Sequence, residues 1–173
     1  AAPGDFDSRF GQGGVVRVTG DGTLPAESVA TALALDNSGR VLVAGIATQN
    51  RTGIVARLTA GGARDNTFGG AGYVLRPRTA GTITREPLQL FSLAGGTALL
   101  TESVERVCVS TPGLCSVSNI FVPRIEATRL LADGTADSSY AAGTSPVLSF
   151  VPASVTAGAD GSLSVMGVQK LFP

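Results

Sequence analysis

Apolar and polar residues alternate over short stretches of this chain, and turn-forming residues separate the stretches. Residues 30–36 (ATALALD) alternate with the period of two that is typical of a strand, the next residues (NSG) signal a turn, and residues 40–45 (RVLVAG) form a second apolar run. This order predicts a β-hairpin closed by a short turn that contains glycine. Residues 53–60 (GIVARLTA) and 72–76 (GYVLR) predict a third and a fourth strand. The pattern therefore predicts a meander of about four strands.

Two phrases recur along the chain. The first has an aspartate three residues after a glycine, and an aromatic residue three residues after that aspartate. Its copies are Gly4-x-x-Asp7-x-x-Phe10, Gly62-x-x-Asp65-x-x-Phe68 and Gly134-x-x-Asp137-x-x-Tyr140. The second phrase is the hairpin, whose copies are residues 33–45, 155–167 and, more weakly, 91–102. Asp7 and Asp65 are 58 residues apart, and Asp65 and Asp137 are 72 apart, the excess being roughly an insertion around residues 108–115. Such a period indicates a repeat architecture.

The recurring residues are predicted to have structural roles in a turn. Asp7, Asp65 and Asp137 can each accept hydrogen bonds from backbone N–H groups two residues further on. Phe10, Phe68 and Tyr140 are predicted to fold back over the hairpin as apolar plugs. The glycines of the phrase permit the positive φ angles that other residues adopt only at a cost.

The segments GDFDSRFGQGGVV (4–16), ALALDNSGRVLVAG (32–45) and IVARLTAGGARDNTFGGAGYV (54–74) resemble the bacterial delta-60 repeat family. The resemblance covers nearly the whole chain, closely in the first pair of repeats and loosely over residues 87–148. It implies blades of a β-propeller and, commonly, secretion. It implies no catalytic residues.

The predicted fold class is all-β and β-propeller-like, with about three antiparallel four-stranded repeats in a single domain, residues 1–173. Its parts are a repeat tail at 1–20, a repeat at 28–76, a repeat at 86–148 that carries the cysteine insertion, and a repeat head at 150–173. The tail and the head together would build the third blade. That blade is predicted to be incomplete, because GIVARL has no copy after Met166.

Three blades make a smaller ring than the usual four to eight or so. The chain is therefore expected either to pair with a second copy or to form an open body with free strand edges, and we favour self-association. Open edges invite β-augmentation by a neighbouring chain.

Composition agrees with this fold class. The chain has 23 Gly and a single Lys, Lys170, whereas helices draw their solvent faces from Lys, Glu and Gln. A hydrophobic fraction of 43% argues against disorder driven by charge. Every apolar run is interrupted well before the roughly 18 residues of a membrane-spanning helix, so no membrane span is predicted.

The charge pattern does not favour nucleic acid as a partner. The formal net charge is zero, and the basic residues are spread without blocks, whereas nucleic-acid binding needs a basic face. The densest group, Arg76, Arg78 and Arg85, is predicted to be solvated loop surface.

Cys108 and Cys115 flank STPGL, whose Pro-Gly pair predicts a turn between two strands. A disulfide between them is the favoured reading over a zinc site, because two thiols in a chain without His make a poor zinc set. A disulfide indicates an oxidising compartment. The N-terminal AAPGDFD also resembles the product of signal-peptide cleavage. We therefore expect a secreted or periplasmic protein.

Candidate chemistry is sparse. The absence of His excludes His-dependent nucleophile activation and most catalytic zinc sites. Two carboxylate pairs could in principle serve a glycosidase, and some of the same aspartates could offer oxygen ligands to calcium, but surface or turn roles are favoured for all of them. The two pairs are Glu102 with Glu105 and Asp5 with Asp7, and the calcium candidates are Asp5, Asp7, Asp133 and Asp137. No catalytic residue, cofactor or metal is therefore predicted.

The favoured function is a secreted or periplasmic non-catalytic repeat protein that scaffolds or binds proteins and assembles through open β edges into an oligomer or filament. Its expected partner is a second copy or another extracellular protein. The alternative is a small lectin-like module, although carbohydrate recognition relies on aromatic rings and the chain has no Trp and only Tyr73 and Tyr140. A hydrolase using a carboxylate pair is the least favoured reading.

Overall fold

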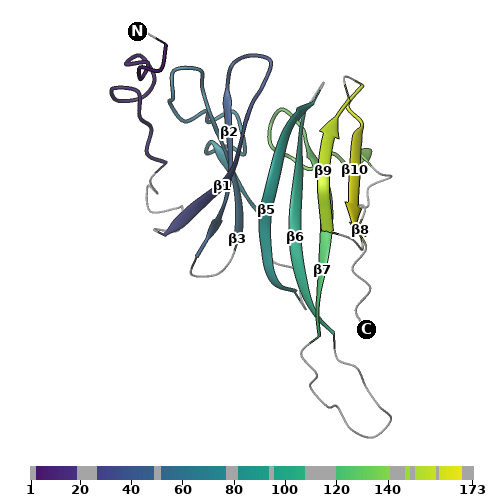
Figure 1. Cartoon of the computed structure of the whole chain (residues 1–173). Coiled ribbons are helices and arrows are strands. Elements are labelled where there is room, and N and C mark those ends of the chain that lie inside the picture. The colour runs from purple at the N-terminus through teal and green to yellow at the C-terminus, as the bar shows by residue number, and fades with distance from the viewer. Residues whose placement is uncertain are drawn as a thin grey trace, which may run out of the picture.

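The computed structural model describes residues 3–18, 27–48, 52–76, 82–93, 96–107, 120–140, 147–148, 151–158 and 160–168. These residues form three antiparallel sheets, and no α-helix occurs among them (Figure 1). The first sheet contains β1 (Ser28–Leu35), β2 (Val41–Ala47), β3 (Thr52–Leu58) and β4 (Tyr73–Arg76). The second contains β5 (Thr82–Leu93), β6 (Gly96–Val107), β7 (Ile120–Leu130) and β8 (Val147–Leu148). The third contains β9 (Val151–Ala157) and β10 (Leu163–Val168).

The first two sheets are meanders, because the spatial order of their strands is the order of the sequence. This confirms the predicted all-β class and the four-stranded repeat. The four strands of the first sheet lie within a few residues of the stretches expected from alternation. Arg76 ends β4, as the predicted strand 72–76 implies, whereas Arg85 lies within β5 and not in the predicted loop, and Arg78 is outside the described residues.

A local hydrogen-bond pattern sets the turn of the first hairpin. The Asp36 carboxylate accepts hydrogen bonds from the backbone N–H groups of Ser38 and Arg40, both at 2.9 Å. Gly39 adopts a φ of 71°, which lets the chain reverse within five residues and pairs Leu35 with Val41. Because these interactions lie within one short segment, the sequence alone is enough to specify the turn.

The main core lies between the first and second sheets. Its members are Leu42, Ala44, Val55, Phe68, Leu90 and Leu130, with Ala32, Ala34 and Val74 packed against them. Strand β1 turns its small residues toward this core and its large ones, such as Leu33, away from it. Figure 1 shows β5 lying beside the first sheet at this junction. Small side chains on β1 allow that close approach.

A second core lies between the second and third sheets. Ile125 and Ala127 are buried there against Phe91, Tyr140, Val155 and Leu163. The three sheets therefore follow one another side by side, and each junction is filled by apolar side chains from both of its sheets (Figure 1).

The third blade differs in one respect from the one expected. Its described part is the two-stranded sheet of β9 and β10, and the N-terminal tail does not join it. The tail lies on the opposite side of the molecule, beside the first sheet (Figure 1), where the N–H of Gly11 donates to the carbonyl of Gly61 at 2.9 Å. The physical reason is a close backbone approach: a Cβ on Gly62 would lie 2.8 Å from the nitrogen of Gly11.

Phe68 offers a direct test of the main core, because its side chain is fully buried. We expect Phe68→Ala to lower the free energy of unfolding by about 3–5 kcal/mol, through lost apolar burial and the cavity left behind. The matched control is Phe6→Ala, the same chemical change at a side chain that is 76% exposed, with an effect within about 0.5 kcal/mol. Denaturant unfolding measures both, and equal losses would contradict the assigned core.

Candidate interaction surface

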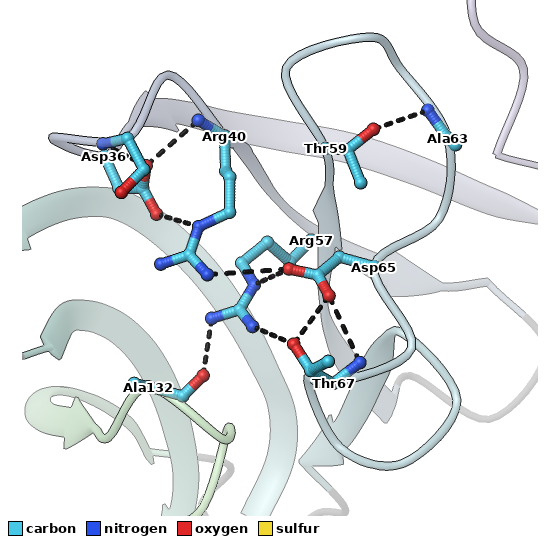
Figure 2. A network of polar contacts seen from close by, with 9 residues as sticks. Asp36, Arg40, Arg57, Thr59, Ala63, Asp65, Thr67 and Ala132 are labelled. Carbon is cyan, nitrogen blue, oxygen red and sulfur yellow. Dashed lines mark hydrogen bonds and ion pairs between the residues drawn. The ribbon is translucent and has the colours of Figure 1, made fainter.

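A buried arginine links three parts of the structure (Figure 2). Arg57 on β3 is only 3% exposed. Its Nε donates to Oδ2 of Asp65 at 2.7 Å, its Nη2 to the hydroxyl of Thr67 at 2.9 Å, and its Nη1 to the carbonyl of Ala132 at 2.5 Å. The first two partners belong to the turn after β3, and the third to the loop after β7. The guanidinium therefore joins the first repeat to the second.

The carboxylate of Asp65 is fully engaged in this network. Hydrogen bonds from the hydroxyl and the N–H of Thr67, at 2.6 and 3.1 Å, and the Arg57 guanidinium hold the pKa of Asp65 below its ordinary value of 3.8, although burial opposes the shift. Arg40 lies 3.6 Å from the same carboxylate. Asp65 is therefore ionised at neutral pH, and its oxygens stabilise the turn.

The equivalent aspartates occupy the same kind of turn. Asp7 accepts a hydrogen bond from the N–H of Arg9 at 3.1 Å, and Asp137 accepts one from the N–H of Ser139 at 2.9 Å. Arg129, on the next repeat, forms an ion pair with Asp137 at 3.2 Å, as Arg57 does with Asp65. The recurring phrase thus has one local geometry in its three copies.

The aromatic residues in the three copies of the phrase differ in how deeply they are buried. Phe68 is buried in the main core, and Tyr140 is half-buried against the Ile125 cluster. Phe10 is half-buried and lines a hollow on the outer face of the first sheet.

Where the structure describes them, the residues considered for chemistry lie in turns or on a strand. Asp133 accepts hydrogen bonds from the N–H and hydroxyl of Thr135, at 2.9 and 2.7 Å, which is again a turn role. The structure places Glu102 and Glu105 on β6. Among the described residues no group of three or more His, Cys, Asp or Glu could hold a metal ion. Cys108 and Cys115 lie outside the described residues.

An apolar hollow lies on the outer face of the first sheet. It has a volume of about 420 Å³. Its walls are Phe10, Val16 and Val18 of the tail, with Ser28, Val29, Ala30, Leu33, Val41, Val43, Gly45, Ile54, Ala56 and Leu58 of the sheet. Ser28 supplies the only polar side chain of this lining. Leu33 is 68% exposed, and Val29 and Leu35 are exposed beside it.

Sequence reasoning expected open strand edges and missed this open face. The signal was present: on β1, Leu33 and Leu35 are larger than Ala32 and Ala34, which alternate with them. An alternation of small and large apolar residues does not say which set is covered, however, because both sets can be buried.

Comparison with known proteins gives one match. Residues 37–68 match the family model described as a domain of unknown function (DUF5122) beta-propeller. The matched segment runs from the first hairpin turn through β2 and β3 to Phe68, so it includes Arg57 and Asp65. It supports a β-propeller repeat family for this chain. No curated protein and no solved structure matches the chain. The described part of the chain has no helix that is long and apolar enough to cross a membrane.

The ion pair of Arg57 and Asp65 can be tested by comparing equivalent aspartates. We expect Asp65→Asn to lower the free energy of unfolding by about 3 kcal/mol, because it leaves the buried guanidinium without its counter-charge. The control is Asp7→Asn at the exposed copy, where solvent screens the ion pair with Arg9 and we expect a much smaller change. Denaturant unfolding at neutral pH measures both, and similar losses in the two variants would argue against the buried pair.

The same variant has a defined pH dependence. Because the folded-state pKa of Asp65 lies below 3.8, its contribution to stability is complete above the ordinary pKa and is lost as the pH falls through the folded-state value. Asparagine does not titrate. The difference in stability between the wild type and Asp65→Asn should therefore be constant near neutrality and narrow below 3.8. Acid unfolding curves of the two proteins check this, and a difference that widened in acid would refute it.

Proposed function

We propose that this chain is a non-catalytic repeat protein of the delta-60 type that acts outside the cytoplasm and binds other protein chains as a scaffold. The observation that carries this proposal is the apolar surface that the described residues leave open on β1, at Val29, Leu33 and Leu35, with the adjoining hollow of about 420 Å³. Exposed contiguous apolar surface of this kind is typical of protein interaction sites.

The chemistry of the hollow supports binding over catalysis. Small-molecule sites combine apolar walls with several placed polar groups, and the hollow has one polar side chain, Ser28. The buried carboxylate of Asp65 is held by Arg57 and Thr67, which leaves it a structural task. Nothing in this lining would activate a nucleophile or move a proton.

The aromatic residues favour a protein partner over a carbohydrate. Sugar binding relies on exposed tyrosine or tryptophan faces. Tyr73 packs against Ala47 and Ile54, and Tyr140 packs against the Ile125 cluster. The aromatic side chain of the hollow is Phe10, at the centre of an aliphatic lining.

The finer family assignment rests on the repeated phrases. The hairpin turn at Asp36 and the Asp65–Phe68 turn lie at or within the segment that matches the β-propeller family, and each has copies elsewhere in the chain. A location outside the cytoplasm rests on the pair Cys108 and Cys115.

A site-specific photo-crosslinker tests the binding role. Incorporated in place of Leu33 in the full chain and activated in cells of the source organism, it should give a protein adduct whose partner peptide is identified by mass spectrometry. The control is the same group in place of Leu131, which is 38% exposed and lies in a turn away from the hollow. No adduct at position 33, or equal adducts at both positions, would overturn the proposed function.

The proposed location has its own test. A chain recovered from an oxidising compartment should show no reactive thiol when denatured, until a reductant is added, because Cys108 and Cys115 are joined. Cys108→Ser should expose one reactive thiol without any reductant. Two reactive thiols in the unreduced wild type would contradict the disulfide.

A further inference from the structure

One position of the repeated hairpin has three different environments. In each hairpin a residue of the first strand lies directly opposite a residue of the second, and the equivalent pairs are Leu33 with Val43, Leu90 with Leu99, and Val155 with Val165. Leu90 is 6% exposed, buried against the first sheet, and Val155 is half-buried against the second sheet. Leu33 is 68% exposed. This hairpin face is therefore the one that packs on the preceding blade, and in the first sheet no blade among the described residues covers it.

The N-terminal tail marks where such a blade belongs. The N–H of Gly69 donates to the carbonyl of Asp133 at 2.7 Å where the first repeat meets the second, and Gly11 donates to Gly61 at 2.9 Å in the equivalent place. A Cβ on Gly134 would lie 3.0 Å from Cγ1 of Val74, and one on Gly62 would lie 2.6 Å from Cγ2 of Val16. The tail thus sits on the first sheet as the turn of the first repeat sits on the second. What the tail does not bring is a hairpin to fill the hollow beside Phe10.

At the opposite end of the molecule, the third sheet exposes the face that, in the first sheet, packs against the next sheet. On β9 and β10 the residues equivalent to Ala34, Leu42 and Ala44 are Thr156, Ser164 and Met166. In the first sheet these positions are covered by the second sheet, whereas all three are exposed on the third, and Met166 is 73% exposed. Figure 1 shows the first sheet and the third sheet on opposite sides of the molecule.

We propose that a second copy of this chain docks its β9–β10 hairpin on the outer face of β1–β4, with Met166 entering the hollow beside Phe10. This inference rests on the proposed function, whose binding surface it assigns to a particular partner. The contact repeats the junctions already present between the sheets. Neither surface carries a charge to desolvate among the residues named, and methionine adapts well to an irregular apolar hollow.

The geometry of such a contact is head-to-tail. Two different surfaces meet, so an open assembly of any length has one free surface of each kind, at its two ends. Contacts of this type close into a ring or extend into a filament, according to the rotation between neighbours.

Two single substitutions and their mixture test this arrangement in the full chain. Leu33→Glu and Met166→Glu each place a charge in one half of the junction, and sedimentation should show the dissociation constant for self-association rising by about 30-fold or more in each variant. An equimolar mixture of the two variants retains one intact pair of surfaces and should form a 1:1 dimer that does not grow further. Leu131→Glu is the control and should associate as the wild type does. Because these side chains are exposed, circular dichroism should match the wild type in all three variants, and so should thermal unfolding at concentrations at which the wild type is monomeric.

Three results would overturn the inference: a wild-type chain that stays monomeric at high concentration, a Met166→Glu variant that associates as the wild type does, or a mixture that remains monomeric. A monomeric chain whose position 33 still crosslinks to a different protein, or to a further segment of its own polypeptide, rejects the second copy as the occupant. Only the adduct to a different protein leaves the proposed binding role in place. A chain that neither associates nor gives an adduct rejects both proposals.

Discussion

The structure depends on the buried guanidinium of Arg57. A charge with 3% exposure is stable only when its donors have partners, and here they are the carboxylate of Asp65, the hydroxyl of Thr67 and the carbonyl of Ala132. The first two partners hold the turn that places Phe68 over the core. The third ties that turn to the next sheet. One side chain therefore couples the local shape of a repeat to the contact between repeats.

The junction between sheets has two components, a directional one and an apolar one. The directional component is the backbone contact of Gly69 with Asp133, repeated by Gly11 and Gly61. The apolar component is the hairpin face that buries Leu90 and leaves Leu33 open. The backbone contact forms at Gly11 and Gly61 even though no hairpin among the described residues covers that sheet. It therefore sets the position of one repeat on the next, and the apolar hairpin face supplies most of the buried surface. This separation explains why the outer face of β1–β4 is shaped for a sheet and carries almost no polar groups.

Much of the fold followed from local patterns. Alternation located the strands of the first sheet, and the recurring glycine, aspartate and aromatic residues located the turns, since each of those turns is closed by atoms within about five residues. The position of Arg85 on a strand was not foreseen, because a polar residue near the start of a strand looks like loop surface in sequence. The place of the N-terminal tail was not foreseen either. Its docking depends on a backbone contact between Gly11 and Gly61, which are distant in sequence and carry no side-chain signal.

By itself the sequence determined the class of fold, the repeat and the turn geometry, because these depend on residue spacing and on hydrogen bonds within short segments. Only the tertiary structure decided which face of each hairpin is covered. Strand β1 has apolar residues on both faces, Ala34 on one and Leu33 on the other, so alternation cannot say which face is buried. The second sheet packs against the face of Ala34, and that packing decides which face is covered. The larger residue is left on the open side, and that outcome is the basis of the proposed contact with another chain.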